Sequence, residues 1–187
     1  MAALSTRGAR PPTAAAKLIA RWESLGLPGR AGCSEERLAA FESRAGARIP
    51  ADLRELLARA NGAAEDPDGF CFWPLEEYSP FEEAALCAPG CPGVDDGGIY
   101  YVFCDYLQWS WAYAIRLIGP GDDEPGGRIV PVGMNEMFTV ADSFSEFTDL
   151  YLRDSERLYP PAPRDAGSLH PGQEGVTGDA EPGGALP

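Results

Sequence analysis

The first sixty residues contain three stretches in which apolar side chains recur every three or four positions, the spacing of one helix face. These stretches cover residues 13–25, 34–45 and 49–60. Thr13 and Ser34 precede the first two as N-cap residues, since their side-chain oxygens can accept a free backbone N–H. Pro50 suits the first position of the third. We therefore expect three helices, ended by Gly26, Gly46 and Asn61-Gly62.

Beyond these helices the pattern changes to short apolar runs rich in aromatic and β-branched residues, which favour strands. The predicted strands are residues 70–73, 99–103, 111–117, 129–132 and 137–140. Trp111, Tyr113 and Ile115 alternate with smaller or polar residues, as in a half-buried strand. The last strands are joined by short turns, so we expect antiparallel neighbours. Residues 79–98 form a long connection rich in proline, glycine and acids.

A final helix is predicted from Ser143, whose spacing from Glu146 matches a capping box. Its apolar face carries Phe144, Phe147 and Leu150, and Pro160 follows its end. The chain therefore has helices first, then strands, then a helix. This segregated order is typical of an α+β fold. We expect an antiparallel sheet of about 4–6 strands flanked by helices.

The same patterns divide the chain into four segments. Residues 1–12 have no apolar period and are expected to be disordered, and residues 13–33 form an N-terminal helix and a linker. Residues 34–159 form the main domain. Residues 160–187 contain too few large aliphatic side chains to build a core, so disorder is expected there as well.

The charge of the chain is strongly negative and is concentrated in the part predicted to fold. The net charge is −14, from 29 acidic and 15 basic residues, and residues 31–160 alone carry −15. Such a charge repels nucleic acid and anionic membranes and attracts basic partners. Solubility alone also explains acidity, so charge by itself does not decide between the two interpretations.

Several features of the sequence predict a cytoplasmic protein. The N-terminal sequence MAALSTRGARPPTAAAK lacks the apolar region of a signal peptide. No apolar run approaches the roughly 18 residues that span a bilayer. The five cysteines are odd in number and irregularly spaced, which is not the pattern of a disulfide framework.

Residues suited to catalysis are scarce. The chain has one histidine, His170, in the predicted C-terminal tail, and one lysine, Lys17, so no histidine-based triad and no lysine mechanism is expected. Cys87 and Cys91 resemble half of a zinc site but lack a second pair. No glycine-rich loop matches a phosphate-binding motif. We predict that the protein is not an enzyme and binds no cofactor or metal.

Acid pairs leave one catalytic alternative open. Asp95-Asp96 and Asp122-Asp123 could hold a divalent metal, although neighbouring acids on a loop are more often solvated charge. A metal-dependent enzyme is therefore retained as the third hypothesis.

The most unusual segment is residues 99–113, in which seven of fifteen residues are aromatic. Alternation along strands places Tyr101, Phe103, Trp111 and Tyr113 in the core. The others can lie at the surface, where tyrosine and tryptophan beside acids suit a protein-binding face. The candidate partner-binding residues are Asp95, Asp96, Asp105, Tyr106 and Trp109.

Four segments, taken in order, resemble the SMI1/KNR4 (SUKH) superfamily. RIPADLRELLARANGA (48–63) resembles its helix with an aliphatic-proline start and an Asn-Gly end. FCFWPLEEY (70–78) resembles its next strand, and YYVFCDYLQWSWAYAIRL (100–117) its central strand pair. VADSFSEFTDLYL (140–152) resembles its closing helix. The resemblance covers about residues 34–158; the first helix and the 79–98 loop do not align with it.

The resemblance implies an α+β domain without catalytic residues. Bacterial members of the superfamily are regarded as immunity proteins that neutralise polymorphic toxins, many of them nucleases, and fungal members act as regulatory scaffolds. We therefore expect a protein-binding domain whose partner is another protein, in the first place a basic toxin domain. A regulatory interaction module without a toxin partner is the alternative.

Overall fold

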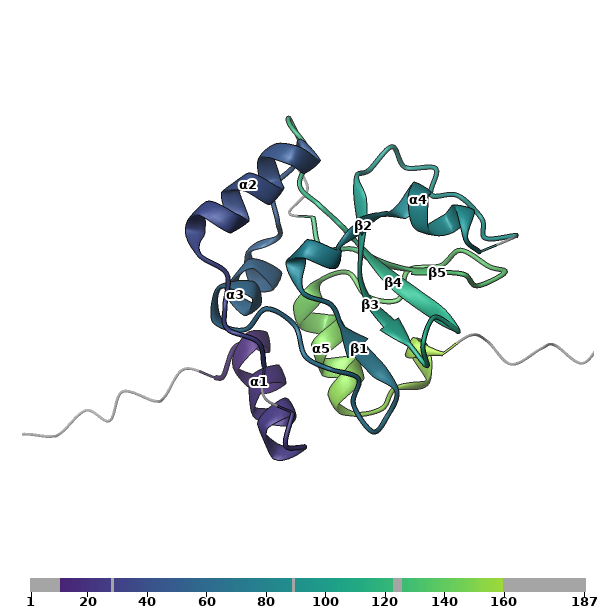
Figure 1. Ribbon diagram of the computed structural model, residues 1–187. Helices are drawn as coiled ribbons and strands as arrows, with labels where there is room; N and C mark the ends of the chain where they lie inside the picture. The colour runs from purple at the N-terminus through teal and green to yellow at the C-terminus, as the bar shows by residue number, and fades with distance from the viewer. Residues whose placement is uncertain (1–10, 28, 89, 123–125, 160–187) are drawn as a thin grey trace, which may run out of the picture.

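The computed structural model describes residues 11–27, 29–88, 90–122 and 126–159, and Figure 1 shows the arrangement of their helices and strands. The helices are α1 (Ala14–Ser24), α2 (Glu35–Ala45), α3 (Ala51–Arg59), α4 (Phe81–Leu86) and α5 (Phe144–Leu152), with 3-10 turns η1 (Leu75–Glu77) and η2 (Glu156–Leu158). The strands are β1 (Phe70–Phe72), β2 (Ser79–Pro80), β3 (Tyr100–Tyr106), β4 (Trp111–Arg116) and β5 (Ile129–Val132).

The five strands form one antiparallel sheet in the order β1-β3-β4-β5. The short strands β1 and β2 lie end to end beside β3: β1 pairs with its C-terminal half and β2 with its N-terminal half. The predicted α+β class with an antiparallel sheet is confirmed.

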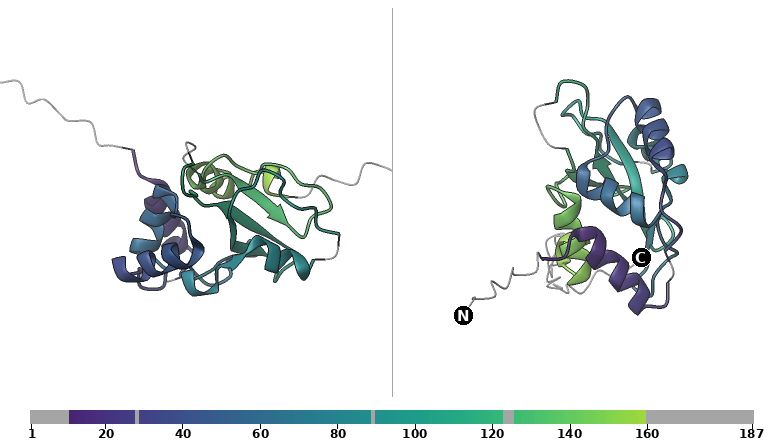
Figure 2. Two further views of the ribbon diagram at one scale, coloured as in Figure 1. Left: turned by 90° about the horizontal axis from the view of Figure 1, so that it is seen from above. Right: turned by 90° about the vertical axis from the view of Figure 1, so that its left-hand side faces the viewer.

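Helices cover both faces of the sheet (Figure 2). Phe144 and Phe147 of α5 pack against the Phe103 ring on one face, with ring centroids 5.9 and 5.3 Å apart. On the other face Phe81 of α4 packs against Tyr100. Six consecutive residues of β3 are consequently buried, rather than every second one. Of the four aromatic residues placed in the core, Trp111 is only half-buried.

The predicted strand at residues 137–140 is absent. Only one bridge, between Ile129 and Ala141, continues the sheet beyond β5. The backbone N–H of Ile129 donates outward to Ala141, and the next outward position on β5 is Pro131, which has no N–H to donate. Pairing therefore stops after Ile129, and β5 remains at the edge.

The connection predicted at residues 79–98 is also more structured than its composition suggests. Its first part contains β2 and α4, and Phe81 and Ala84 of α4 are buried against the sheet. Two apolar residues three positions apart are too short a signal to distinguish a six-residue helix from a loop.

The capping predictions are largely confirmed. The side chains of Thr13, Ser34 and Ser143 each accept a backbone N–H at the start of their helix, and Gly46 adopts the left-handed conformation after α2. The prediction for Pro50 is off by one position, because Pro50 is the N-cap of α3 and not its first helical residue.

Two further capping details differ from the predictions made from the sequence. Glu146 accepts the N–H of Asp142 (2.8 Å), one residue before the expected one. Asn61-Gly62 does not cap α3, which ends at Arg59. Instead the Asn61 side chain accepts the N–H of Leu75 (2.8 Å) and donates to Glu76 (3.0 Å), so it links the helices to η1.

Helix α1 packs against α3 and α5. Its Trp22 is 1% exposed and contacts the Phe72 ring edge-on at 5.4 Å. Lys17 also forms an ion pair with Asp149 of α5 at 2.7 Å. The N-terminal helix thus adds to the core built by the sheet and α5.

Disorder is expected for residues 1–12 and 160–187. Residues 1–10 and 160–187, including His170, lie outside the described residues. Within the described ranges, no helix combines the length and apolar character needed to cross a membrane.

Candidate protein-binding surface

The turn between β3 and β4 holds Trp109 at the surface in a strained backbone conformation. Leu107, Gln108 and Trp109 have φ angles of 47°, 50° and 71°, a left-handed region that side-chain-bearing residues rarely occupy. Each such residue costs on the order of 1 kcal/mol or more, so surrounding contacts must maintain it. Trp109 is 48% exposed and Leu107 49%.

Asp105 is the main anchor of this turn. Its carboxylate accepts the backbone N–H of Trp109 (3.2 Å) and the indole N–H of Trp73 (2.5 Å). The residue is only 5% exposed, and no basic side chain in the described ranges forms an ion pair with it. Asp105 is therefore a buried acid whose hydrogen-bond donors are both neutral.

One side of Trp109 borders a hollow of about 460 Å³ that we call the acidic hollow. Its lining residues are Cys71, Trp73, Glu77, Ser79, Asp105 and Trp109. Burial raises the pKa of the Cys71 thiol to about 11, and the nearby carboxylates of Asp105, Glu77 and Glu65 raise it further, against a smaller opposite effect of Arg30. The potential in this hollow is therefore negative.

Trp109 also lines a second hollow of about 470 Å³, the apolar hollow. Its lining residues are Ala84, Cys87, Ala88, Trp109, Ser110, Trp111, Val132 and Gly133, none of which carries a formal charge. Leu86 of α4, close in sequence to three of these residues, is 85% exposed. Trp109 thus forms a wall shared by two hollows of different polarity, which together we call the Trp109 surface.

Apart from Val132 and Gly133 of the apolar hollow, the Trp109 surface comes from a segment without positive charge. Residues 60–115 contain no lysine or arginine and ten acids: Glu65, Asp66, Asp68, Glu76, Glu77, Glu82, Glu83, Asp95, Asp96 and Asp105. Glu77 was not among the candidate residues. The long run without a basic residue was the sequence signal that could have identified it.

The five candidate residues do not form one site. Asp105 and Trp109 lie together. Tyr106 follows Asp105 but belongs to an aromatic group, stacked on Trp111 with centroids 4.4 Å apart and in contact with Phe70. Asp95 and Asp96 precede β3 and therefore lie near the opposite end of that strand.

Asp96 organises the loop before β3. Its carboxylate accepts the hydroxyl of Tyr100 (2.7 Å), the N–H of Gly98 (2.8 Å) and the guanidinium of Arg128 (2.8 Å). Partial burial opposes ionisation of this carboxyl, but these hydrogen bonds and the charges of Arg116 and Arg128 outweigh it and lower its pKa. Asp95, beside it, is exposed.

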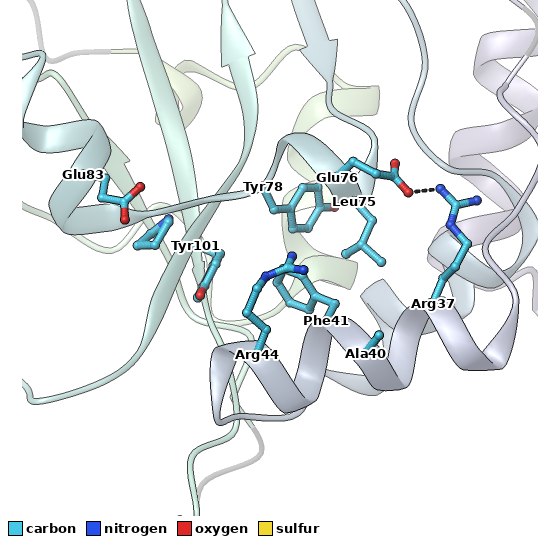
Figure 3. A pocket seen from close by; sticks show the side chains of 10 residues that line it. Arg37, Ala40, Phe41, Arg44, Leu75, Glu76, Tyr78, Glu83 and Tyr101 are labelled. Carbon is cyan, nitrogen blue, oxygen red and sulfur yellow. Dashed lines mark ion pairs between the residues drawn. The ribbon is translucent and has the colours of Figure 1, made fainter.

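A larger hollow of about 640 Å³ lies between α2 and the segment from η1 to α4 (Figure 3). Arg37 and Glu76 form an ion pair across it, and the Arg44 guanidinium lies 5.4 Å from the centre of the Phe41 ring. Both signs of charge line this hollow. It therefore lacks the one-sided negative potential of the acidic hollow.

The described residues offer little chemistry for catalysis. Among them no group of three or more His, Cys, Asp or Glu side chains is placed to hold a metal. Burial raises the pKa of the Cys104 thiol, as at Cys71, so these thiols are poor sources of a nucleophilic thiolate. Asp122 accepts the N–H of Gly119 (2.9 Å) and pairs with Arg116 (3.3 Å), while Asp123 lies outside the described residues.

Comparison with known proteins assigns the fold to a family. A search of the curated proteins finds no match to this chain. The model of the SMI1 / KNR4 family (SUKH-1) matches residues 32–150, a region that runs from just before α2 into α5 and includes the whole Trp109 surface. Since this match covers more than half of the sequence, the chain belongs to the SMI1 / KNR4 family (SUKH-1).

Proposed function

We propose that this protein is a non-catalytic immunity protein that binds and blocks a basic toxin domain of the nuclease type. The observation that carries the proposal is the Trp109 surface, in which a half-exposed tryptophan lines both an acidic and an apolar hollow. Tryptophans in such partly enclosed positions contribute much of the binding energy of protein interfaces.

The charge of the segment that forms the surface supports a basic partner. Residues 60–115 contain ten acids and no base, and two of these acids, Asp105 and Glu77, line the acidic hollow beside Trp109. Nucleases bind their anionic substrates in positively charged clefts, so an acidic surface can occupy the cleft and exclude the substrate. Complementary charges also accelerate association and penalise wrong partners.

The strained β3–β4 turn is consistent with this role. Three successive left-handed residues are unfavourable for folding, yet two acceptors stabilise the turn. The Asp105 carboxylate accepts the N–H of Trp109, and the Gly69 carbonyl accepts the N–H of Leu107. Backbone strain of this kind concentrates at functional sites. Here it holds the Trp109 side chain outward without relying on a partner to order it.

The experiment is co-expression of the full chain with the toxin domain encoded by a neighbouring gene. We expect the chain to restore growth and to be recovered in a complex with the toxin, and the complex to weaken as salt screens the charges. Trp109→Ala should reduce rescue, whereas Leu152→Ala, at an exposed position on α5, should not.

The proposal fails if no toxin-like gene lies nearby and no toxin is neutralised. Recovery of a stable complex with a non-basic regulatory protein would instead support the scaffold alternative.

A further inference from the structure

We propose that the acidic hollow receives an arginine side chain of the partner, and that the apolar hollow receives an aliphatic side chain two residues away from that arginine. This inference rests on the proposed function and specifies the chemistry of the partner at the same surface. Trp109 lines both of the proposed side-chain subsites.

The buried carboxylate of Asp105 has more acceptor positions than it uses. A carboxylate offers about four acceptor positions, and the two hydrogen bonds of Asp105 come from the neutral N–H groups of Trp73 and Trp109. Buried carboxylates are usually paired with a cation. No ion pair to Asp105 forms within the described part of the chain, so a guanidinium from a partner would supply the missing charge.

Two tryptophan rings line the acidic hollow. The centroids of the Trp73 and Trp109 rings lie 4.9 Å apart with their planes at 50°, and Trp109 is 48% exposed. A planar guanidinium stacks on an indole face and donates hydrogen bonds in its own plane at the same time. A lysine ammonium cannot do both, so the site favours arginine.

Glu77 is available to bind a guanidinium of the partner. Its only ion pair in the described residues is with Arg30 at 3.7 Å, and both side chains are more than half exposed. Pairs of this kind contribute little, so Glu77 can turn toward a second guanidinium. Glu77 and Asp105 can then bind one arginine from two directions.

The apolar hollow adjoins the acidic hollow, since Trp109 lines both. Ala84, Ala88 and Val132 are among the other residues that line the apolar hollow. In an extended segment, side chains two residues apart point the same way and lie about 7 Å apart. A segment of the form Arg-x-Leu can therefore place one side chain in each hollow.

The test uses three short peptides and the full chain. The probes are acetyl-Arg-Ser-Leu-amide, its citrulline analogue, which has the same shape without the charge, and acetyl-Arg-Ser-Ser-amide. Binding is followed through the indole N–H signals of the four tryptophans in ¹H–¹⁵N NMR spectra, assigned with Trp→Phe variants.

We expect the arginine-leucine peptide to move the signals of Trp73 and Trp109 and to leave Trp22 unchanged, because Trp22 is buried between α1 and the Phe72 ring. Citrulline should weaken binding about tenfold, and serine in place of leucine about threefold to tenfold. Glu77→Gln should remove most of the preference for arginine over citrulline. Glu23→Gln, at an exposed position on α1, should leave that preference unchanged.

Three results would overturn the inference: no signal change at millimolar peptide, equal binding of the arginine and citrulline peptides, or equal effects of Glu77→Gln and Glu23→Gln. If the wild-type chain and Trp109→Ala neutralise the toxin equally well, the subsites are wrong while the immunity function stands. If the peptides discriminate as expected but no toxin is neutralised, the subsites stand and the immunity function fails.

Discussion

At the scale of single residues, Asp105 connects the fold to the candidate binding surface. It lies in the central strand, accepts hydrogen bonds from Trp73 and Trp109, and is nearly completely buried. The sequence identified Asp105 and Trp109 as candidates because acids and aromatics are adjacent there. It could not reveal the contact with Trp73, which depends on the pairing of β1 with β3.

Asp105→Ala should lower the free energy of unfolding by about 1–3 kcal/mol, because it leaves two N–H groups without their acceptor. The expected change can be measured by urea denaturation. Asp95→Ala is the matched control: Asp95 is an exposed aspartate, and its loss should change stability by less than about 0.5 kcal/mol. Equal effects of the two substitutions would show that Asp105 does not anchor the turn.

Asp96 gives a prediction about pH. Folding lowers the pKa of its carboxyl, so the ionised form stabilises the folded state above the ordinary aspartate pKa of about 4. That contribution is lost as the pH falls through the lowered folded-state pKa. The stability difference between wild type and Asp96→Asn should therefore be largest above about pH 5. It should decrease as the pH falls below about 4.

Urea titrations of both proteins between these pH values measure this difference. A stability difference between wild type and Asp96→Asn that stays constant or increases toward low pH would contradict the assigned hydrogen bonds of Asp96.

At the scale of elements, local signals identified the capped helices and the main strands. Ser34 and Ser143 cap their helices through contacts three residues away, which a sequence reveals directly. The predicted strand at residues 137–140 failed because of Pro131 in the neighbouring strand. The predicted alternation in β3 failed because α4 and α5 cover opposite faces. Both outcomes depend on tertiary partners and lie beyond local pattern.

The link between the helices and β1 depends on Gly62. Its φ angle is +78°, and an added Cβ would lie 2.5 Å from the Phe72 carbonyl oxygen. Gly62→Ala should therefore lower the free energy of unfolding by at least about 2 kcal/mol, from backbone strain and steric overlap together.

Two other glycines separate these causes in the same urea experiment. Gly46 has a φ of +66° but nothing within 4 Å of its added Cβ, so its substitution by alanine should cost about 1 kcal/mol from strain alone. Gly93 has neither feature, and its substitution should be nearly neutral. A different order of the three effects would contradict this account.

At the scale of the whole molecule, α1 lies before the residues that match the family model yet contributes to the common core. Trp22→Ala should destabilise the entire protein by about 3–5 kcal/mol, since it leaves a cavity between α1 and Phe72. Far-ultraviolet circular dichroism and tryptophan fluorescence should report one shared unfolding transition. Glu23→Ala, on the exposed side of α1, is the control. If Trp22→Ala left the unfolding transition of the sheet unchanged, α1 would not be part of the common core.

The distribution of charge over the whole molecule determines how a basic partner should approach. We expect the triple variant Glu77→Gln, Glu82→Gln, Glu83→Gln to reduce the association rate with the toxin domain by about tenfold at low salt, and to reduce its dependence on ionic strength. The control removes three charges elsewhere, at the exposed residues Glu23, Glu136 and Glu156. Both variants have the same net charge, so stopped-flow measurements over a range of salt concentrations separate a local field from total charge. Equal rates for the two variants would place the interface away from the Trp109 surface, because only a nearby charge acts within a Debye length of about 10 Å at moderate salt.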